Sequence, residues 1–339
     1  MNDPAAAASL AAAMARHRSG DLAAARPLYR RHLQHAPQDV GAWCLLASLE
    51  GQCGDHRAAE QAFRKAIAAD PAQAQGHAGL GTSLLLADDP AAAIDALRRA
   101  LELDPDLSDT RYQLAVALHR CERRDEAAEV LEHVLDQHPG HLQARHNLGA
   151  ICLERGDPQR AAACFRAVLA QDKGRVPAWV ALARAQTAMD HPAEAEESLR
   201  QALTLAPSDV SGRAALGRLL QSLGRLDEAR QAYVAILERR PGDPAALAGL
   251  AELDLHGGDA RGGMARLAPA LANGLPALPV MVAAARLWLD LGEYATAAEQ
   301  LSQWTADPRM THRLSVNLRR LLGEALDKSA FGLGFGLGR

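Results

Sequence analysis

The chain has 339 residues, of which 48% are hydrophobic but only 4% aromatic, and its formal net charge is −4. Abundant alanine with few aromatic residues suits helix–helix packing and excludes a β-sandwich or barrel. The acidic balance creates no global field for nucleic acid or an anionic membrane, so neither is expected as a partner. The apolar run near the start is too short to span a bilayer and follows no Lys or Arg, so no targeting segment or membrane insertion is predicted.

A period of 34 residues runs through most of the chain. Neighbouring prolines of one series differ by 34, except for a gap of 68 where Lys173 stands at the expected place. This series is Pro37, Pro71, Pro105, Pro139, Pro207 and Pro241. Leucines from Leu46 to Leu250 and small residues from Ala25 to Ala297 recur in phase with it. A fixed period of this length predicts stacked repeats, which offer a long concave surface rather than a catalytic pocket.

Residues 40–73 show what one unit contains. Trp43, Leu46 and Glu50 follow each other at helical spacing in the first half, which ends at a Gly-Asp turn. The second half places Phe63 on an apolar face and ends at Pro71. Spacings of three and four residues predict an amphipathic helix, and glycine and proline mark helix ends. Each unit is therefore predicted to be a helix, a tight turn and a second helix.

The predicted units follow one another from near residue 6 to residue 311. Their ranges are 6–39, 40–73, 74–107, 108–141, 142–175, 176–209, 210–243, 244–277 and 278–311. A terminal helix over 312–329 is expected next, because this stretch repeats the first-helix pattern. The predicted fold is all-α, a right-handed superhelical solenoid of about nine helix-turn-helix units with a C-terminal helix.

Residues 330–339 form a glycine-rich tail, where a second helix should follow the terminal one. Glycine alternates with apolar residues from Phe331 to Gly338. Because each interior glycine costs about 1 kcal/mol relative to alanine, no helix is expected from about residue 331. The terminal helix would then expose apolar surface. Either the tail is a local peculiarity or the chain is the front portion of a longer one.

Unit after unit carries the same set of residues. They are Trp43, Leu46 and Ala47, the Leu-Gly pairs beginning at Leu80, Leu148 and Leu216, and then Ala59, Phe63 and Pro71. This pattern resembles the tetratricopeptide repeat family, whose unit of 34 residues is a pair of antiparallel helices. The resemblance implies that ligands lie on the inner face of the superhelix and that the chain is a protein-interaction scaffold.

No catalytic or cofactor motif stands out in the chain. It contains no phosphate-binding glycine loop, no paired-histidine zinc motif and no nucleophile elbow, so no enzymatic activity, cofactor or metal is expected. The best metal candidate is the run His133, His138, His141 and His146, which we interpret as solvated loop histidines. The five cysteines lack a CxxC pair, which favours small apolar fillers in a reducing, cytoplasmic compartment.

The face of each first helix that is turned away from the stack carries the candidate binding residues. Arg184 and Arg218 occupy the same place in adjacent units, so their guanidinium groups should project side by side and grip a carboxylate. The alternative is that each arginine pairs with an acid in the groove, for instance Arg218 with Glu252. The predicted peptide-binding residues are Tyr112, Gln113, Arg120, His146, Asn147, Arg184, Arg218, Gln221 and Arg286.

The predicted function is a scaffold that binds a peptide or protein segment, an acidic one if the two arginines are free. If they are structural, Leu85, Leu86 and Tyr112 become the better candidates. Gln113 and Asn147 fall short of a continuous asparagine ladder, which argues against long, sequence-independent gripping of a peptide backbone. The alternative is a substrate-recruiting region of a larger modifying enzyme, of the sulfotransferase or glycosyltransferase type found in similar bacterial proteins, whose catalytic domain is not in this chain. Partner identity and oligomeric state stay open.

Overall fold

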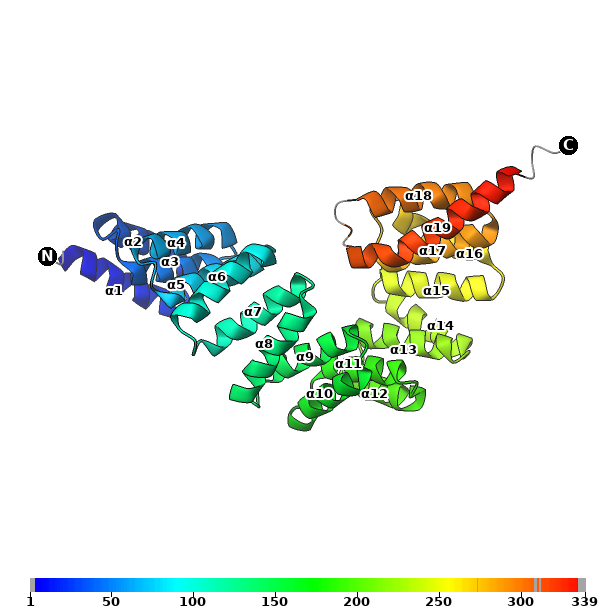
Figure 1. Cartoon of the computed structure of the whole chain (residues 1–339), viewed down its shortest axis with the longest axis horizontal. Coiled ribbons are helices and arrows are strands. Elements are labelled where there is room, and N and C mark those ends of the chain that lie inside the picture. Colours follow the sequence, from blue (N-terminus) through cyan, green and yellow to red (C-terminus); the bar gives the residue numbers. More distant parts are fainter. Residues whose placement is uncertain (1–3, 273, 308–309, 311, 335–339) are drawn as a thin grey trace. The chain divides into compact units, whose positions relative to one another are not determined.

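The computed structural model describes residues 4–272, 274–307, 310 and 312–334. These residues form 19 helices and no strand (Figure 1). The prediction of an all-α chain of repeated helix pairs is confirmed. No helix in this part of the chain is long and apolar enough to cross a membrane.

The chain divides into two compact units, here called unit 1 (Met1–Gln171) and unit 2 (Asp172–Arg339). The boundary falls in the connection where Lys173 stands in place of the repeated proline. Unit 1 contains α1 (Pro4–Arg18), α2 (Leu22–His35), α3 (Val40–Gln52), α4 (His56–Ala69), α5 (Ala74–Leu86), α6 (Pro90–Leu103), α7 (Ser108–Arg120), α8 (Arg124–Gln137), α9 (Leu142–Glu154) and α10 (Pro158–Gln171). Unit 2 contains α11 (Val176–Ala188), α12 (Pro192–Leu205), α13 (Val210–Ser222), α14 (Leu226–Leu237), α15 (Pro244–His256), α16 (Ala260–Leu271), α17 (Leu278–Leu291), α18 (Tyr294–Ala306) and α19 (His312–Gly334).

The turn inside each helix pair has one residue in the left-handed backbone region. Glycine occupies this position in most of the turns, as at Gly54 with φ of 79°. Asp88, Glu122 and Asp190 hold the same place with φ of 63°, 60° and 60°. Since a side chain in this region is strained, the repeat imposes the turn even where the residue opposes it.

Aspartate caps start many of the helices. In each case the carboxylate accepts a hydrogen bond from the backbone N–H three residues further on, which satisfies a donor that the helix leaves free. The capping residues are Asp21, Asp39, Asp55, Asp89, Asp157, Asp209, Asp243 and Asp259. These local bonds fix where each helix begins.

In the helices α3, α5, α7, α9, α11 and α13, the fourth residue ties the helix to the connection before it. Its side chain contacts the carbonyl oxygen six residues earlier, at the proline place. Trp43 Nε1 donates to Pro37 at 2.8 Å, and Trp179 Nε1 donates to Lys173 at 2.9 Å. The same contact is made by His77, Arg111, Arg145 and Arg213. Tryptophan, histidine and arginine alternate at this place because each offers a nitrogen at the required reach.

The small residues that recur in the sequence lie where two helices approach closely. Ala59, Ala93 and Ala127 are fully buried. A Cβ added to Gly81 would lie 2.5 Å from the Leu97 side chain, and one added to Gly149 would lie 2.8 Å from the Phe165 ring. Larger side chains would therefore overpack these contacts.

The last helix corrects one prediction. We expected no helix from about residue 331, but α19 continues to Gly334. The cost of each glycine lowers helix stability without forbidding the conformation. Residues 335–339 lie outside the described part of the chain. Leu318 and Leu321 are buried in one core with Trp288, whereas Val316 and Leu326 are each 52% exposed.

Candidate functional site

Arg184 and Arg218 line one pocket in unit 2. They belong to the C-terminal halves of α11 and α13, and both side chains are exposed to solvent. The pocket has a volume of about 340 Å³. Its other lining residues are Ala183, Thr187, Ala188, Leu199, Ala215, Leu219 and Ser222. The repeat thus brings the two guanidinium groups to the same small, otherwise uncharged hollow.

Neither of these arginines makes a hydrogen bond or ion pair with any residue that the structure describes. The predicted alternative, an Arg218–Glu252 pair, does not form. Instead Arg286 Nη1 lies 2.7 Å from Glu252 Oε1, and Gln221 Nε2 donates to Glu252 Oε2 at 3.4 Å. Two of the predicted binding residues, Gln221 and Arg286, are therefore held by Glu252, while Arg184 and Arg218 are not.

The hydroxyl groups in the pocket are already used as donors. Thr187 Oγ1 donates to the carbonyl of Ala183 at 2.9 Å, and Ser222 Oγ donates to that of Leu219 at 2.7 Å. Within the described lining, this leaves the guanidinium groups as the free donors. Since guanidinium donates and never accepts, the pocket is built for a ligand that accepts hydrogen bonds.

A second hollow of about 230 Å³ adjoins the first through Arg218, which lines both. Its lining is mostly apolar: Tyr233, Ala245, Ala248, Gly249, Glu252, Leu278, Pro279 and Val282 accompany Arg218. Burial raises the pKa of Tyr233 to about 12, against the opposing effect of the Arg218 charge. The Tyr233 hydroxyl donates to Gln221 Oε1 at 3.3 Å. The phenol is therefore neutral at physiological pH.

Two glycines make room for the Tyr233 ring. A Cβ on Gly217 would lie 2.7 Å from the ring, and one on Gly249 would lie 2.4 Å from it. The residues predicted from the sequence did not include Tyr233, Thr187 or Ser222. The sequence signal that could have identified the Tyr233 ring is the Leu216-Gly217 pair, because its glycine leaves room for an aromatic residue of the next helix.

Several of the predicted residues of unit 1 contact other side chains of unit 1. Asn147 Nδ2 donates to the Tyr112 hydroxyl at 3.1 Å, and the Tyr112 ring centroid is 4.9 Å from that of His141. The ring of His146 is 5.2 Å from that of Phe165. Gln113 is partly buried on the same helix as Tyr112. The structure thus brings Tyr112 and Asn147 together as a local bridge between α7 and α9.

Arg120 is also engaged within unit 1. Its Nη1 donates to the carbonyl of Leu85 at 2.9 Å and lies 3.7 Å from the Asp88 carboxylate. This arginine covers the C-terminal end of α5, where a cation is favourable. Among the predicted arginines, Arg120 and Arg286 therefore have internal partners.

The histidines that we interpreted as solvated have structural contacts. His138 Nε2 lies 2.7 Å from Ser108 Oγ, and His141 Nδ1 accepts the backbone N–H of Ala144 at 3.1 Å as a helix cap. In the part of the chain that the structure describes, no group of three or more His, Cys, Asp or Glu residues could hold a metal ion.

The cysteine thiols are free. Burial raises the pKa of Cys44, Cys121, Cys152 and Cys164, so these thiols stay protonated near neutral pH. Cys152 is buried and packs as a small apolar residue.

The stacked helix pairs define a helical repeat protein with hollows that are lined in part by its first helices. Family models described as tetratricopeptide repeat match residues 6–49, 44–108, 84–152, 152–219, 190–251 and 278–303. The chain belongs to the tetratricopeptide repeat family. Its tetratricopeptide repeats indicate a protein-interaction scaffold.

Solved structures share this fold at low sequence identity. A tetratricopeptide repeat protein from Parabacteroides merdae is similar with a TM-score of 0.64 and 16% identity, covering 75% of this chain and 98% of that one. PilF of Pseudomonas aeruginosa is similar with a TM-score of 0.53 and 20% identity, covering 63% of this chain and 97% of that one. A chain of the APC/C hetero-tetramer Cut9–Hcn1 is similar with a TM-score of 0.56 and 18% identity, covering 71% of this chain and 48% of that one. No curated protein sequence matches the chain.

Proposed function

We propose that the chain is a protein-interaction scaffold that binds an acidic peptide segment through Arg184 and Arg218. The observation that carries this proposal is the pair of guanidinium groups in one pocket with no acid to hold them. Guanidinium is planar and presents parallel donors that match the two oxygens of a carboxylate. The carboxylate of the ligand then lies beside Arg184 and Arg218, in a pocket whose lining contains no Asp or Glu.

The neighbouring apolar hollow suits the next part of the same segment. It shares Arg218 with the charged pocket, and its Glu252 is neutralised by Arg286. A side chain entering it would contact Ala248 and Val282, which are apolar. The Cut9–Hcn1 assembly, which has a similar fold, is likewise a complex of two different proteins.

The size of the effect follows from the exposure of the arginines. Each charge-assisted hydrogen bond contributes about 1.5–3 kcal/mol where solvent is excluded and under about 1 kcal/mol at an open rim. Since both side chains are exposed, the lower range applies, and together they contribute about tenfold in affinity.

The test is a double charge reversal, Arg184→Glu/Arg218→Glu, titrated by calorimetry with a capped glutamate-rich peptide. We expect affinity to fall by tenfold or more while the thermal midpoint stays unchanged. The control is Arg239→Glu/Arg240→Glu, which changes the net charge equally in exposed residues of unit 2 outside the pocket.

Two results would contradict the proposal. Equal loss of affinity in both double variants would mean that only overall charge matters. A lowered midpoint in Arg184→Glu/Arg218→Glu would mean that these arginines stabilise the fold instead of binding a ligand.

A further inference from the structure

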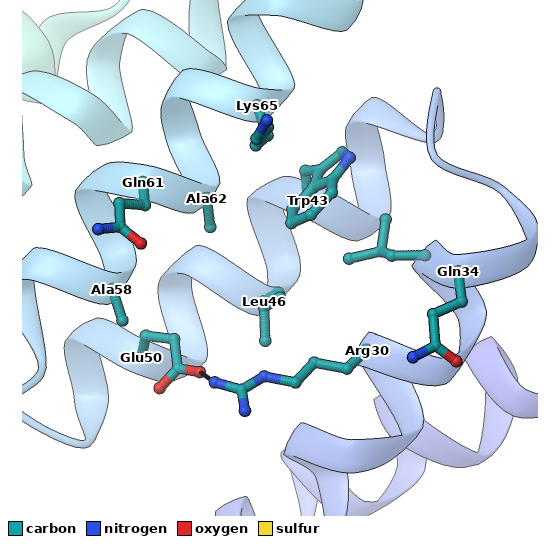
Figure 2. Close-up of a pocket in the computed structure, with 10 residues that line it drawn as sticks. Arg30, Gln34, Trp43, Leu46, Glu50, Ala58, Gln61, Ala62 and Lys65 are labelled. Carbon is teal, nitrogen blue, oxygen red and sulfur yellow. Dashed lines mark hydrogen bonds and ion pairs between the residues drawn. The ribbon is translucent and has the colours of Figure 1, made fainter.

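Unit 1 contains a different pocket, of about 400 Å³, which lies between the second helices α2 and α4 with α3 as its floor (Figure 2). Trp43 and Leu46 rise from the floor, and Ala58 and Ala62 form the α4 side. The remaining lining residues are Arg30, Leu33, Gln34, Glu50, Gln61 and Lys65. None of the candidate residues predicted from the sequence lies here.

The pocket lacks an ion pair that bridges the corresponding pair of second helices further along the chain. In α8, Glu126 occupies the place that Ala58 has in α4, and it accepts a hydrogen bond from Arg98 at 2.9 Å. Arg98 in turn occupies the place of Arg30. The ion pair thus bridges two successive second helices, and alanine at residue 58 removes the bridge.

Trp43 is the second feature that distinguishes this pocket from the other repeats. In the next 34-residue repeat, Ala92 also occupies the bridging place, but His77 stands where this repeat has Trp43. Both side chains contact the preceding connection, Trp43 at 2.8 Å and His77 at 3.0 Å. Only the indole adds a broad apolar wall above the groove.

The acidic residue in the lining of the pocket, Glu50, is paired with arginines of α2. Glu50 is only 2% exposed, and its two oxygens lie 2.7 Å from Arg26 Nη2 and 3.0 Å from Arg30 Nη2. Its negative charge is therefore neutralised by two arginines. Lys65 is exposed and makes no ion pair with any described residue, so the rim of the pocket keeps a positive charge.

We propose that this pocket binds a partner peptide with a bulky aliphatic side chain next to a carboxylate. The aliphatic side chain packs on Trp43, Leu33 and Leu46, and the carboxylate meets the ammonium of Lys65. The positive rim selects an acidic neighbour, since a basic segment would be repelled. This site shares no residue with the pocket of Arg184 and Arg218, so it holds or fails independently of the proposed function.

The experiment follows the indole N–H resonance of Trp43 in the full-length chain by NMR. The probe is a capped nine-residue peptide with a central leucine followed by two glutamates; matched peptides carry glutamine for glutamate or serine for leucine. We expect the leucine–glutamate peptide to shift the Trp43 resonance at the lowest concentration. The Arg184→Glu/Arg218→Glu variant should leave this titration unchanged.

Three variants test the pocket, and two of them, Ala58→Glu and Trp43→His, introduce residues that other repeats have at the same place. Ala58→Glu introduces the residue that forms the bridging ion pair at Glu126, places a carboxylate in the pocket lining, and should weaken binding by about tenfold or more. Lys65→Gln should weaken binding of the glutamate peptide by about threefold and leave the glutamine peptide unaffected. Trp43→His keeps the contact that His77 makes and should lower affinity with little loss of stability, read by calorimetry.

Three results would overturn the proposal. The first is no shift at Trp43 with any of the peptides. The second is a titration that Ala58→Glu leaves unchanged although the variant is folded by circular dichroism. The third is a Trp43 resonance that moves with protein concentration alone, with a dimer in sedimentation that Ala58→Glu dissociates, because a second copy of the chain would then occupy the pocket.

Discussion

The pockets of the two units use arginine in opposite ways. In unit 1, Arg26 and Arg30 converge on the buried carboxylate of Glu50. In unit 2, Arg184 and Arg218 reach a pocket that contains no acid. The first arrangement holds the repeat together, and the second leaves charge available to a ligand. The difference teaches that an arginine in this fold is structural when the repeat places a buried acid within its reach.

Unit 2 contains its own example of the structural arrangement. Asp254 occupies in α15 the place that Glu50 has in α3, and it is 8% exposed. Arg230 Nη1 lies 3.0 Å and Arg266 Nη2 lies 2.9 Å from its oxygens. Asp254 is thus paired with arginines from two second helices, α14 and α16, whereas the two arginines that pair with Glu50 both belong to α2. Arg184 and Arg218 stand outside this scheme.

The largest expected effect is the loss of stability in the double variant Arg26→Met/Arg30→Met. Without the arginines, the Glu50 carboxylate is buried and unpaired, so the free energy of unfolding should fall by about 3 kcal/mol. Arg184→Met/Arg218→Met should change it by less than about 0.5 kcal/mol. Urea denaturation followed by circular dichroism compares the two. Similar losses in both would erase the distinction between structural and available arginines.

The next effect concerns Tyr233, which lies beside Arg218. Its pKa is raised from 10.0 to about 12, chiefly by burial. Because the folded pKa exceeds the unfolded one, the stability that this group contributes is complete below pH 10 and lost as pH rises to 12. The shift corresponds to about 2–3 kcal/mol.

Tyr233→Phe isolates this contribution. At pH 8 the variant should be less stable by about 1 kcal/mol, because the hydrogen bond to Gln221 is lost. Above pH 11 the order should reverse. If the stability difference is the same at both pH values, the phenol does not titrate as its burial requires.

A smaller effect separates two glycines of unit 2. Gly249→Ala places a Cβ 2.4 Å from the Tyr233 ring, and should lower stability by about 1–2 kcal/mol through overpacking. Gly323→Ala in α19 meets no atom within 4 Å, and should raise stability by about 0.5–1 kcal/mol through helix propensity. Thermal denaturation of both variants measures the difference. A stable Gly249→Ala protein would mean that the ring can move away.

The smallest expected effect is on peptide affinity, and comes from a change that lets Arg218 pair with Glu252. Arg286→Gln releases the Glu252 carboxylate, which lines the same hollow as Arg218. Glu252 should then compete with the ligand, weakening an acidic peptide by about threefold. Arg286→Gln/Glu252→Gln should restore the original affinity in calorimetry. Failure of the second change to restore binding would place Arg286 itself in contact with the peptide.

Much of the fold follows from the sequence because each helix pair is determined locally. The period predicts the pairs, the Asp caps and Gly turns mark their ends, and the small places show where helices approach. The exception is the end of the chain, where α19 continues to Gly334 despite its glycines. Helix propensity is an average cost there, and the rest of a long helix can outweigh it.

The candidate site was predicted only in part. The repeat period alone predicts that Arg184 and Arg218 share a place in adjacent units, and the structure puts them in one pocket. That Arg286 pairs with Glu252, and that Arg120 contacts Leu85, could not be predicted, since long side chains choose among several partners within reach. The role of the chain as the recruiting region of a larger enzyme stays a prediction.

The sequence by itself determined the architecture: helix pairs, their length, their turns and their close contacts, because these depend on neighbours along the chain and on a repeated period. Only the tertiary structure decided which charges are available. Glu50 and Asp254 become buried and each pairs with two arginines, whereas Arg184 and Arg218 pair with no acid in the described part of the chain. The pocket at Trp43 is likewise lined by residues of three helices, α2, α3 and α4, with Ala58 on one side. Availability and enclosure are properties of side chains brought together from separate helices, and no single repeat contains them.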